Sequence, residues 1–329
     1  MKRTRWLACS AALVLTGALP SESASARATI VDLGTLGGAQ SIAYDINNKG
    51  QIVGMSTTDS GQVHAVMWEH GATFDLGASF PGRYSEAHAI NDAGQIVGAV
   101  SNGWESRAVM WEPDGTVRDL GSFGGRWNEA WDINNDAEVT GRSWTATEAE
   151  RSFLWANGTM TDISGSEVWS MAFGLNDDGH VVGTSTAGAY LWNGTMHPLG
   201  SDSHATRIAW DINNRGQIVG AGEISPRRDS AYVWQNGTTR YLASLGGALN
   251  TARAINERGQ IVGDANVVDY ELPLHAVLWY HDAMTELGML PGASGTSIGS
   301  MAHGINNRGD VVGLSETASG DWHAVLWPR

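Results

Sequence analysis

The chain has 329 residues, a formal net charge of −15 and a single cysteine. An acidic balance with no basic block argues against nucleic acid and anionic membrane surfaces as partners. One cysteine cannot form an internal disulfide, so the fold has to be held by burial, for which this length is sufficient.

The first 26 residues have the pattern of a secretory signal peptide. Lys2, Arg3 and Arg5 form a basic start, an apolar stretch follows from residue 6 to residue 19, and Ala24-Ser25-Ala26 is an A-x-A cleavage site. Cleavage there removes a net charge of +2 and leaves −17 on residues 27–329, which then contain no cysteine. A lipoprotein would need Cys9, which lies too early in the apolar stretch. We therefore expect a bacterial protein secreted to the extracellular space, with no further membrane span.

A signature of the form Ala-x-x-[Ile/Leu]-Asn recurs seven times beyond this segment. Its asparagines are Asn47, Asn91, Asn134, Asn176, Asn213, Asn256 and Asn306. Each is followed by a turn, a short apolar run that usually ends in glycine, and then a tryptophan: Trp68, Trp111, Trp155, Trp192, Trp234, Trp279 and Trp327. A period of about 40 residues with several short apolar runs per unit predicts a β-propeller.

The unit at residues 42–77 predicts four strands in chain order. We expect strands at residues 42–47, 51–56, 64–68 and 73–76, with Asn47-Asn48-Lys49-Gly50 as the first turn. Turn residues recur at the spacing of an all-β chain, and helical periodicity is absent.

The two ends of the repeat array predict how the ring closes. Residues 31–34 match the fourth strand of a unit but precede the first complete unit, whereas residues 323–327 match a third strand with no fourth after it. The N-terminal strand can therefore complete the last repeat and leave no free sheet edge. We predict one all-β domain, residues 27–329, folded as a monomeric seven-bladed propeller with four-stranded blades. Independent hairpins are a poor alternative, because two-stranded units are marginal in water.

The chain resembles the bacterial extracellular HAF-repeat family. The resemblance is carried by Leu36-Gly37-Gly38, by the segments at residues 43–47, 50–54 and 64–68, and by their later copies. It implies secretion and a repeat fold, and it implies little about activity because the family is defined by a repeat rather than by a reaction.

The predicted loops divide into a uniform face and a variable face. Short, similar turns follow the repeat asparagines and tryptophans, and we call this side the bottom face. The opposite top face carries longer, dissimilar loops, at residues 77–87, 99–107, 142–151, 264–275 and 288–301. Variable loops on a rigid scaffold commonly carry function.

Seven tryptophans outside the repeat position map to the top face or to the start of an inner strand. They are Trp104, Trp127, Trp131, Trp144, Trp169, Trp210 and Trp322. We predict an aromatic mouth that binds substrate, such as sugar rings or an extended unsaturated molecule. The alternative is that they pack loops against one another.

Two further sets of side chains are predicted near this mouth. The residue after the repeat alanine is expected close to the axis, directed like the Ile or Leu two positions later, and reads Tyr44, His88, Trp131, Phe173, Trp210, Arg253 and His303. Interblade packing is the alternative for Phe173 and Trp210. The third strands open with His64, Arg107, Arg151, Gly188, Ser230, His275 and His323, of which the histidines are candidate substrate contacts or, alternatively, caps of the loop ends. Glu86 and Glu129 are candidate acids.

Known cofactor and metal motifs are absent from the sequence. Asp45, Asp132 and Asp211 only partly match a calcium loop, and no phosphate cradle or nucleophile elbow is present. Since Lys49 is the only lysine after residue 26, Schiff-base chemistry is also disfavoured. We expect neither metal nor cofactor.

Proton transfer is the chemistry that remains. We predict a cofactor-independent lyase or cyclase with His88 or His303 as base, Tyr44 as proton donor and Arg253 stabilising an enolate, while Glu86 orients a histidine. The substrate would be a uronic-acid glycan or a polyhydroxylated or polyketide-like small molecule. The alternatives are a carbohydrate-binding or surface-interaction propeller without catalysis, and a purely structural protein.

Overall fold

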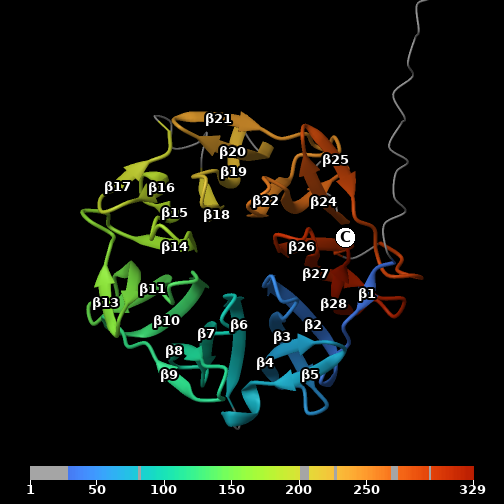
Figure 1. Cartoon of the computed structure of the whole chain (residues 1–329), viewed down its shortest axis with the longest axis horizontal. Helices are drawn as coiled ribbons and strands as arrows, with labels where there is room; N and C mark the ends of the chain where they lie inside the picture. Colours follow the sequence, from blue (N-terminus) through green and yellow to red (C-terminus); the bar gives the residue numbers. More distant parts are fainter. Residues whose placement is uncertain (1–28, 81–82, 201–206, 226–227, 268–272, 296–297) are drawn as a thin grey trace, which may run out of the picture.

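A computed structural model describes residues 29–80, 83–200, 207–225, 228–267, 273–295 and 298–329. Seven four-stranded antiparallel sheets stand around a central axis, which confirms the predicted propeller (Figure 1). The predicted signal peptide lies outside the described residues. Within those residues the only helical segment is one 3-10 turn, η1 (Gly77–Ser79), and no helix is long and apolar enough to cross a membrane.

Each blade runs from an innermost strand at the axis to an outermost strand at the rim. The innermost strands of blades 1 to 7 are β2 (Gly37–Ile46), β6 (Tyr84–Ile90), β10 (Gly124–Ile133), β14 (Ser170–Leu175), β18 (Ile208–Ile212), β22 (Asn250–Ile255) and β26 (Ser300–Ile305). The second strands are β3 (Ile52–Thr58), β7 (Ile96–Ser101), β11 (Val139–Thr145), β15 (Val181–Ser185), β19 (Ile218–Ser225), β23 (Ile261–Asn266) and β27 (Val311–Glu316). The third strands are β4 (Val63–Glu69), β8 (Ser106–Trp111), β12 (Glu150–Ala156), β16 (Gly188–Trp192), β20 (Arg228–Gln235), β24 (Leu274–Tyr280) and β28 (Trp322–Trp327). The outermost strands are β5 (Ala72–Asp75), β9 (Val117–Asp119), β13 (Thr159–Asp162), β17 (Met196–Pro198), β21 (Thr238–Tyr241), β25 (Ala283–Glu286) and, for blade 7, β1 (Val31–Asp32).

The N-terminal strand closes the last blade, as predicted. Val31 pairs with Leu326 and Asp32 pairs with Val325, so β1 is the fourth strand beside β28 (Figure 1). The Nδ1 atom of His323 lies 2.9 Å from an oxygen of Asp32, which adds a side-chain link to the backbone pairing.

The hydrophobic core lies between neighbouring blades rather than within one blade. One cluster joins Val53 and Ala65 of blade 1 to Ala87, Ile96 and Trp111 of blade 2. Each sheet thus buries both faces against its neighbours, which explains why the repeated apolar runs are continuous rather than alternating. The repeat unit has no complete core of its own, so the stability of each blade depends on the closed ring.

Each innermost strand contains a β-bulge at the residue after the repeat alanine. In blade 1, Ala43 pairs with Gly54 and Asp45 pairs with Val53, which leaves Tyr44 as an extra residue. The same register shift occurs in all seven blades. A bulge bends a strand and redirects its side chains, and here it turns seven of them towards the axis.

The bulge accounts for the glycine that ends the apolar run of the second strand. A Cβ on Gly54 would collide with the carbonyl oxygen of Ile42, and the matching glycines of the other six blades meet the same obstacle. It also corrects one expectation from strand alternation. Ile46 packs in the core with Ala43, while Tyr44 faces the axis, so the expected common direction of Tyr44 and Ile46 is wrong.

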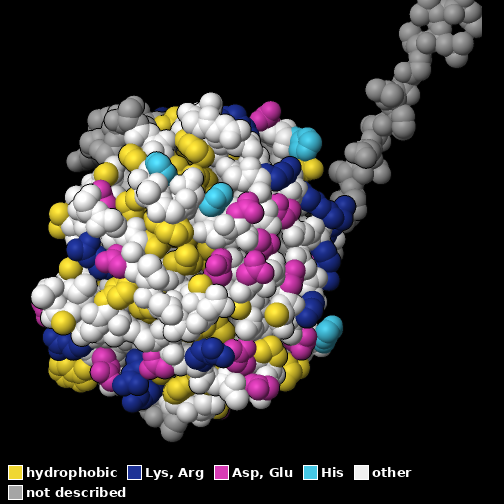
Figure 2. All heavy atoms as spheres, turned by 60° about the vertical axis from the view of Figure 1, so that its left-hand side comes forward, with side chains coloured by type: hydrophobic (Ala, Val, Ile, Leu, Met, Phe, Trp, Pro, Cys, Tyr) yellow, Lys and Arg dark blue, Asp and Glu magenta, His cyan; other side chains and the backbone are white. Residues whose placement is uncertain are grey.

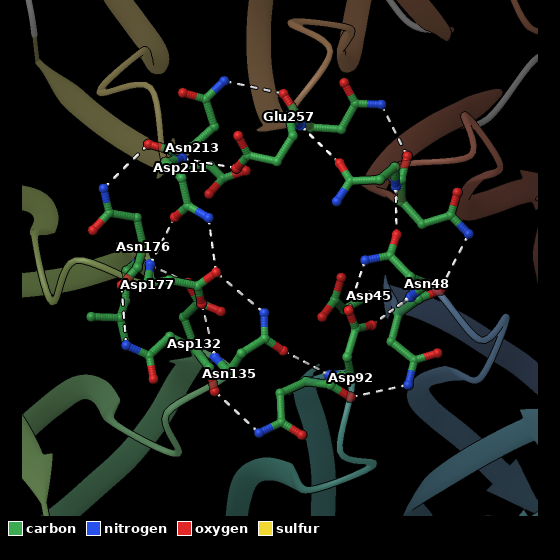
Figure 3. A pocket seen from close by; sticks show the side chains of 18 of the residues that line it. Asp45, Asn48, Asp92, Asp132, Asn135, Asn176, Asp177, Asp211, Asn213 and Glu257 are labelled. Carbon is green, nitrogen blue, oxygen red and sulfur yellow. Dashed lines mark hydrogen bonds between the residues drawn. The ribbon is translucent and has the colours of Figure 1, made fainter.

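The repeat asparagines join the blades into a ring at the bottom face. The Nδ2 atom of each donates to the backbone oxygen of the asparagine in the next blade, over 2.9 to 3.2 Å, and Asn306 closes the circle onto Asn47. A second closed circle joins the residues that follow them, Asn48, Asp92, Asn135, Asp177, Asn214, Glu257 and Asn307, through backbone N–H groups and side-chain oxygens (Figure 3). The repeat asparagine therefore has a structural role, since it links each blade to the next.

Three aspartates lie just above this ring, in blades 1, 3 and 5. The Oδ2 atoms of Asp45, Asp132 and Asp211 each accept a hydrogen bond from a backbone N–H of the next blade (Figure 3). Burial, opposed by these hydrogen bonds, raises the pKa of Asp211 to about 6, and burial together with the other two charges raises that of Asp132. Among the described residues, no group of three His, Cys, Asp or Glu side chains is spaced to hold a metal ion.

Candidate active site at the top of the central axis

A cavity of about 450 Å³ opens at the axis above the aspartates. The seven bulge residues all line it, together with two glutamates that precede repeat alanines and an arginine of β11: Tyr44, Glu86, His88, Glu129, Trp131, Arg142, Phe173, Trp210, Arg253 and His303. The five residues predicted from the sequence as catalytic thus line one cavity, although they come from four innermost strands, β2, β6, β22 and β26. Phe173 and Trp210 face the cavity as well, rather than serving only as interblade packing.

An aromatic belt forms most of the wall. Ring centroids are 5.7 Å apart between His303 and Tyr44, 5.7 Å between Tyr44 and His88, and 5.4 Å between His88 and Trp131. The belt continues through Phe173, at 5.1 Å from Trp131, to Trp210, at 4.5 Å. Such a wall offers apolar surface and ring edges to a flat ligand.

His88 is held in its protonated form by two acceptors. Its Nδ1 atom lies 2.8 Å from the carbonyl oxygen of Ala130, and its Nε2 atom lies 3.2 Å from Oε2 of Glu86. Carbonyl and carboxylate oxygens only accept, so both ring nitrogens must donate. Burial alone would lower the pKa of His88, but the hydrogen bond and charge of Glu86 outweigh burial and raise it.

Glu86 connects His88 to Tyr44. The hydroxyl of Tyr44 donates to Oε1 of Glu86 over 3.3 Å. Burial would raise the pKa of Glu86, but the hydrogen bond and charge of His88, with hydrogen bonds from Tyr84 and Tyr44, lower it. Burial and the charge of Glu86 raise the pKa of Tyr44 well above its ordinary value, so this phenol stays neutral.

His303 has the opposite charge state on the other side of Tyr44. Its Nδ1 atom lies 3.0 Å from the carbonyl oxygen of Ala43 and must donate to it, while Nε2 has no hydrogen-bond partner within the described part of the chain. Burial and the neighbouring charge of Arg253 lower the pKa of His303 to about 3. His303 is therefore a neutral imidazole with a free lone pair.

Both arginines of the cavity are held by carboxylates. Arg253 forms an ion pair through Nε with Asp264, whose side chain is only 5% exposed. Arg142 contacts Glu129 at 3.0 Å and Glu150 at 2.8 Å. The two guanidinium groups also lie near indole rings, at 5.9 Å from Trp210 for Arg253 and at 6.0 Å from Trp131 for Arg142.

Five of the seven predicted ligand-binding tryptophans are absent from the cavity lining: Trp104, Trp127, Trp144, Trp169 and Trp322. Trp104, in the loop between β7 and β8, is 79% exposed. Trp144, on β11, donates weakly from Nε1 to Glu150 over 3.4 Å. The prediction that all seven tryptophans form one aromatic mouth is therefore wrong. Most of these residues lie on loops or on strands farther from the axis.

The three histidines that open third strands do not line the cavity either. The Nδ1 atoms of His64, His275 and His323 lie 2.9 to 3.1 Å from a carboxylate of the outermost strand in the same blade, namely Asp75, Glu286 and Asp32. Their predicted place at the central pocket is corrected accordingly. A link between the third and fourth strands is a scaffold role, as in the alternative interpretation.

Sequence reasoning missed Arg142, Asp264 and Glu150. Arg142 and Asp264 each follow the glycine of a second strand, and the other five blades have an uncharged residue at that position: Met55, Ala99, Thr184, Ala221 and Leu314. A charged residue at this otherwise uncharged repeat position could have identified both residues from the sequence. The position faces the bulge of the innermost strand in the same blade. Glu150 opens a third strand and carried no such signal.

No protein-family model matches the chain, and no curated protein matches it, so the resemblance to the HAF-repeat family stays a prediction. Solved structures share the fold at low identity. An oligogalacturonate lyase from Vibrio parahaemolyticus is 11% identical with a TM-score of 0.53, and the match covers 90% of this chain and 92% of that chain. The β-propeller domain of the Trilobed protease from Pyrococcus furiosus is 11% identical with a TM-score of 0.54, covering 88% and 95%. An acylaminoacyl peptidase from Pyrococcus horikoshii is 12% identical with a TM-score of 0.53 and covers 87% of this chain, which spans only 51% of that peptidase. These similarities show the fold alone.

Proposed function

We propose that the protein is a ligand-processing propeller that catalyses proton transfer in the axial cavity, as a cofactor-independent lyase or cyclase. The observation that carries the proposal is the pair His303 and His88, which face one cavity from either side of Tyr44 in opposite protonation states. Paired titratable groups whose environments drive their pKa values apart are typical of acid–base catalysis. His303 has the form of a base and His88 has the form of an acid.

The reaction begins at a carbon next to a carbonyl group. Nε2 of His303 takes the proton, and the C–H electron pair moves into the carbonyl to give an enolate. Arg253 stabilises the enolate oxygen, as a preorganised donor in a partly buried site. The electrons then return and expel an oxygen at the β-carbon, which takes the proton of His88. Conjugate addition with ring closure uses the same charge states: Nε2 of His303 takes the proton of a hydroxyl group as its oxygen bonds to the β-carbon of an unsaturated carbonyl compound, Arg253 stabilises the enolate, and the proton of His88 goes to the α-carbon.

His88 replaces Tyr44 as the proposed proton donor. The raised pKa of Tyr44 makes its hydroxyl a poor acid, whereas His88 already carries a proton that it shares with Glu86. Glu86 then serves to hold the imidazolium, and Tyr44 separates the two histidines. The similarity to an oligogalacturonate lyase supports the proposal only by showing that this fold is compatible with elimination.

The proposal is tested with the purified chain, without added metal, on a panel of β-hydroxy carbonyl compounds, unsaturated hydroxy ketones and glycans. Chromatography with mass detection would report loss of water, a new double bond or a new ring. His303→Gln and His88→Gln should each lower kcat about 10²–10⁴-fold. Trp322→Phe, outside the cavity, is the control that should leave turnover intact.

Binding without turnover would favour the non-catalytic alternative. The aromatic belt would serve a carbohydrate-binding or small-molecule-binding propeller equally well, but such a protein has no need of two histidines in opposite charge states. Turnover that persists in both histidine variants would overturn the proposed chemistry.

A further inference from the structure

Every charged side chain in the axial cavity has an oppositely charged partner beside it. Glu86 is paired with His88, and Glu129 with Arg142. The remaining cation, Arg253, is paired with Asp264 just behind the wall. No unpaired ionic group of either sign therefore faces the cavity among the described residues that line it.

These pairs lie in a poorly solvated environment. The side chains of His88, Glu86 and Glu129 are 14%, 18% and 19% exposed, and that of Asp264 is 5% exposed. A charged ligand group that enters such a site loses its hydration. The free-energy cost of that loss is offset only where an unpaired group of opposite charge is present in the site. A ligand carboxylate or ammonium group would have to displace a resident partner instead.

The hydrogen-bonding capacity that remains suits an uncharged oxygen compound. Nη1 and Nη2 of Arg253 make no hydrogen bond within the described part of the chain, and they can donate to a carbonyl oxygen while Asp264 keeps the guanidinium compensated. Nε2 of His303 can accept from a hydroxyl group. The acidic surface, where Asp and Glu side chains group towards the right of Figure 2 among scattered Lys and Arg, adds a field that repels anions.

We infer that the cavity selects a neutral, flat, carbonyl-bearing molecule and rejects both its carboxylate and its amine analogues. The inference rests on the proposed function for the identity of the site, and it narrows the substrate class. Uronic-acid glycans, which the sequence alone left open, fall outside it. Unsaturated hydroxy ketones, esters and lactones of polyketide-like character fall within it.

Three probes that share one skeleton test the charge selection. The dissociation constants of methyl cinnamate, cinnamate and cinnamylamine are measured by calorimetry or ligand-observed NMR at pH 7 and constant ionic strength. Methyl cinnamate should bind at least about tenfold more tightly than either ion, and Trp210→Ala should weaken it about tenfold or more, since one stacking wall is removed. Trp104→Ala should leave its affinity unchanged.

Variants with altered charge separate this inference from simple hydrophobicity. Asp264→Asn leaves Arg253 without its counter-charge, so cinnamate affinity should rise about tenfold or more. Glu129→Gln removes one of the two carboxylate partners of Arg142 and should also raise the affinity for cinnamate. This second variant keeps the test decisive if Asp264→Asn does not fold. Asp119→Asn changes the net charge equally, but its partner Arg107 lies outside the cavity, so it is the matched control.

Three results would overturn the inference: equal or tighter binding of either ion to the native chain, no binding of any of the three probes, or no gain of cinnamate affinity in either charge variant. Turnover is scored separately. Loss of charge selectivity with turnover intact rejects this inference alone, whereas retained selectivity without any turnover rejects the proposed function alone.

Discussion

The Nδ2 atom of Asn306 donates to the backbone oxygen of Asn47 across 3.2 Å, although the two residues are 259 positions apart. This bond closes the asparagine ring between the last blade and the first. The ring is independent of β1, which closes blade 7 at its outer edge. The propeller is therefore closed twice, at the axis by side chains and at the rim by a strand.

The asparagine ring should be a main source of stability. Asn134→Ala removes the donor to Asn176 and the acceptor for two turn N–H groups, in a buried position. Buried groups that lose a partner cost more than the bond itself, so the free energy of unfolding should fall by about 2–4 kcal/mol in urea titrations. Asn135→Ala, in the exposed second circle, is the neighbouring control and should cost about 1 kcal/mol or less. Equal losses for the two variants would contradict the role of the inner ring.

The closing strand should protect an edge. A chain that starts at Thr35 lacks β1, the side-chain contact of Asp32 with His323, and the apolar contacts of Ile30 and Leu33. Since β28 would then present unpaired backbone groups, Tm should fall on the order of 5 °C and oligomers should form as concentration rises. A chain that starts at Thr29 is the control. Unchanged Tm and a monomeric elution profile in the shorter chain would show that β1 is dispensable.

The sequence predicts this architecture because the features that set it are local and repeated. Asn47 and Trp68 recur with their surroundings seven times, and Val31-Asp32 is recognisable as a displaced fourth strand. The residues that line the cavity could also be predicted from the sequence, since Tyr44 and His303 occupy one repeat position. The direction of their side chains could not be predicted, because it depends on a bulge that simple strand alternation does not include.

The charge pairs and the loop tryptophans were less predictable for a different reason. Arg142 reaches Glu129 across the register of β10 and β11, and Asp264 reaches Arg253 across that of β22 and β23, so each contact depends on tertiary pairing. Trp104 is exposed on a variable loop, whereas Trp131 follows a repeat alanine and lines the axis. The bulge at that repeat position is what brings Trp131 into the cavity.

Neutral His303 should make the protein sensitive to mild acid. In the folded state its pKa is lowered to about 3, while in the unfolded chain it returns to its ordinary value of 6.5. The stabilisation is present above pH 6.5 and is lost as pH falls towards 3, because only the unfolded chain takes up the proton. Between pH 6 and pH 4 the free energy of unfolding should fall by up to about 1.4 kcal/mol per pH unit more steeply in the native chain than in His303→Gln.

Urea titrations of both proteins at several pH values measure this difference. The comparison cancels the carboxylates and His88, which titrate equally in the two proteins. Asp211, whose raised pKa has the opposite effect on stability as pH falls, is cancelled in the same way. Parallel curves for the two proteins would mean that His303 is not held neutral.

Glu86 should set the alkaline limit of turnover. The proposed acid, His88, must be protonated, and the hydrogen bond and charge of Glu86 raise its pKa against the effect of burial. In Glu86→Gln that charge is gone, so burial dominates, and the alkaline limb of kcat/KM should move to lower pH by about one unit or more. The acidic limb, which reports His303, should stay in place. Glu105→Gln, at a half-exposed glutamate that is paired with Arg107 outside the cavity, is the control for a change of one charge. A rate loss that is uniform across pH would instead indicate that Glu86 only positions the wall, and a limb that moves to higher pH would contradict the assignment of His88 as the acid.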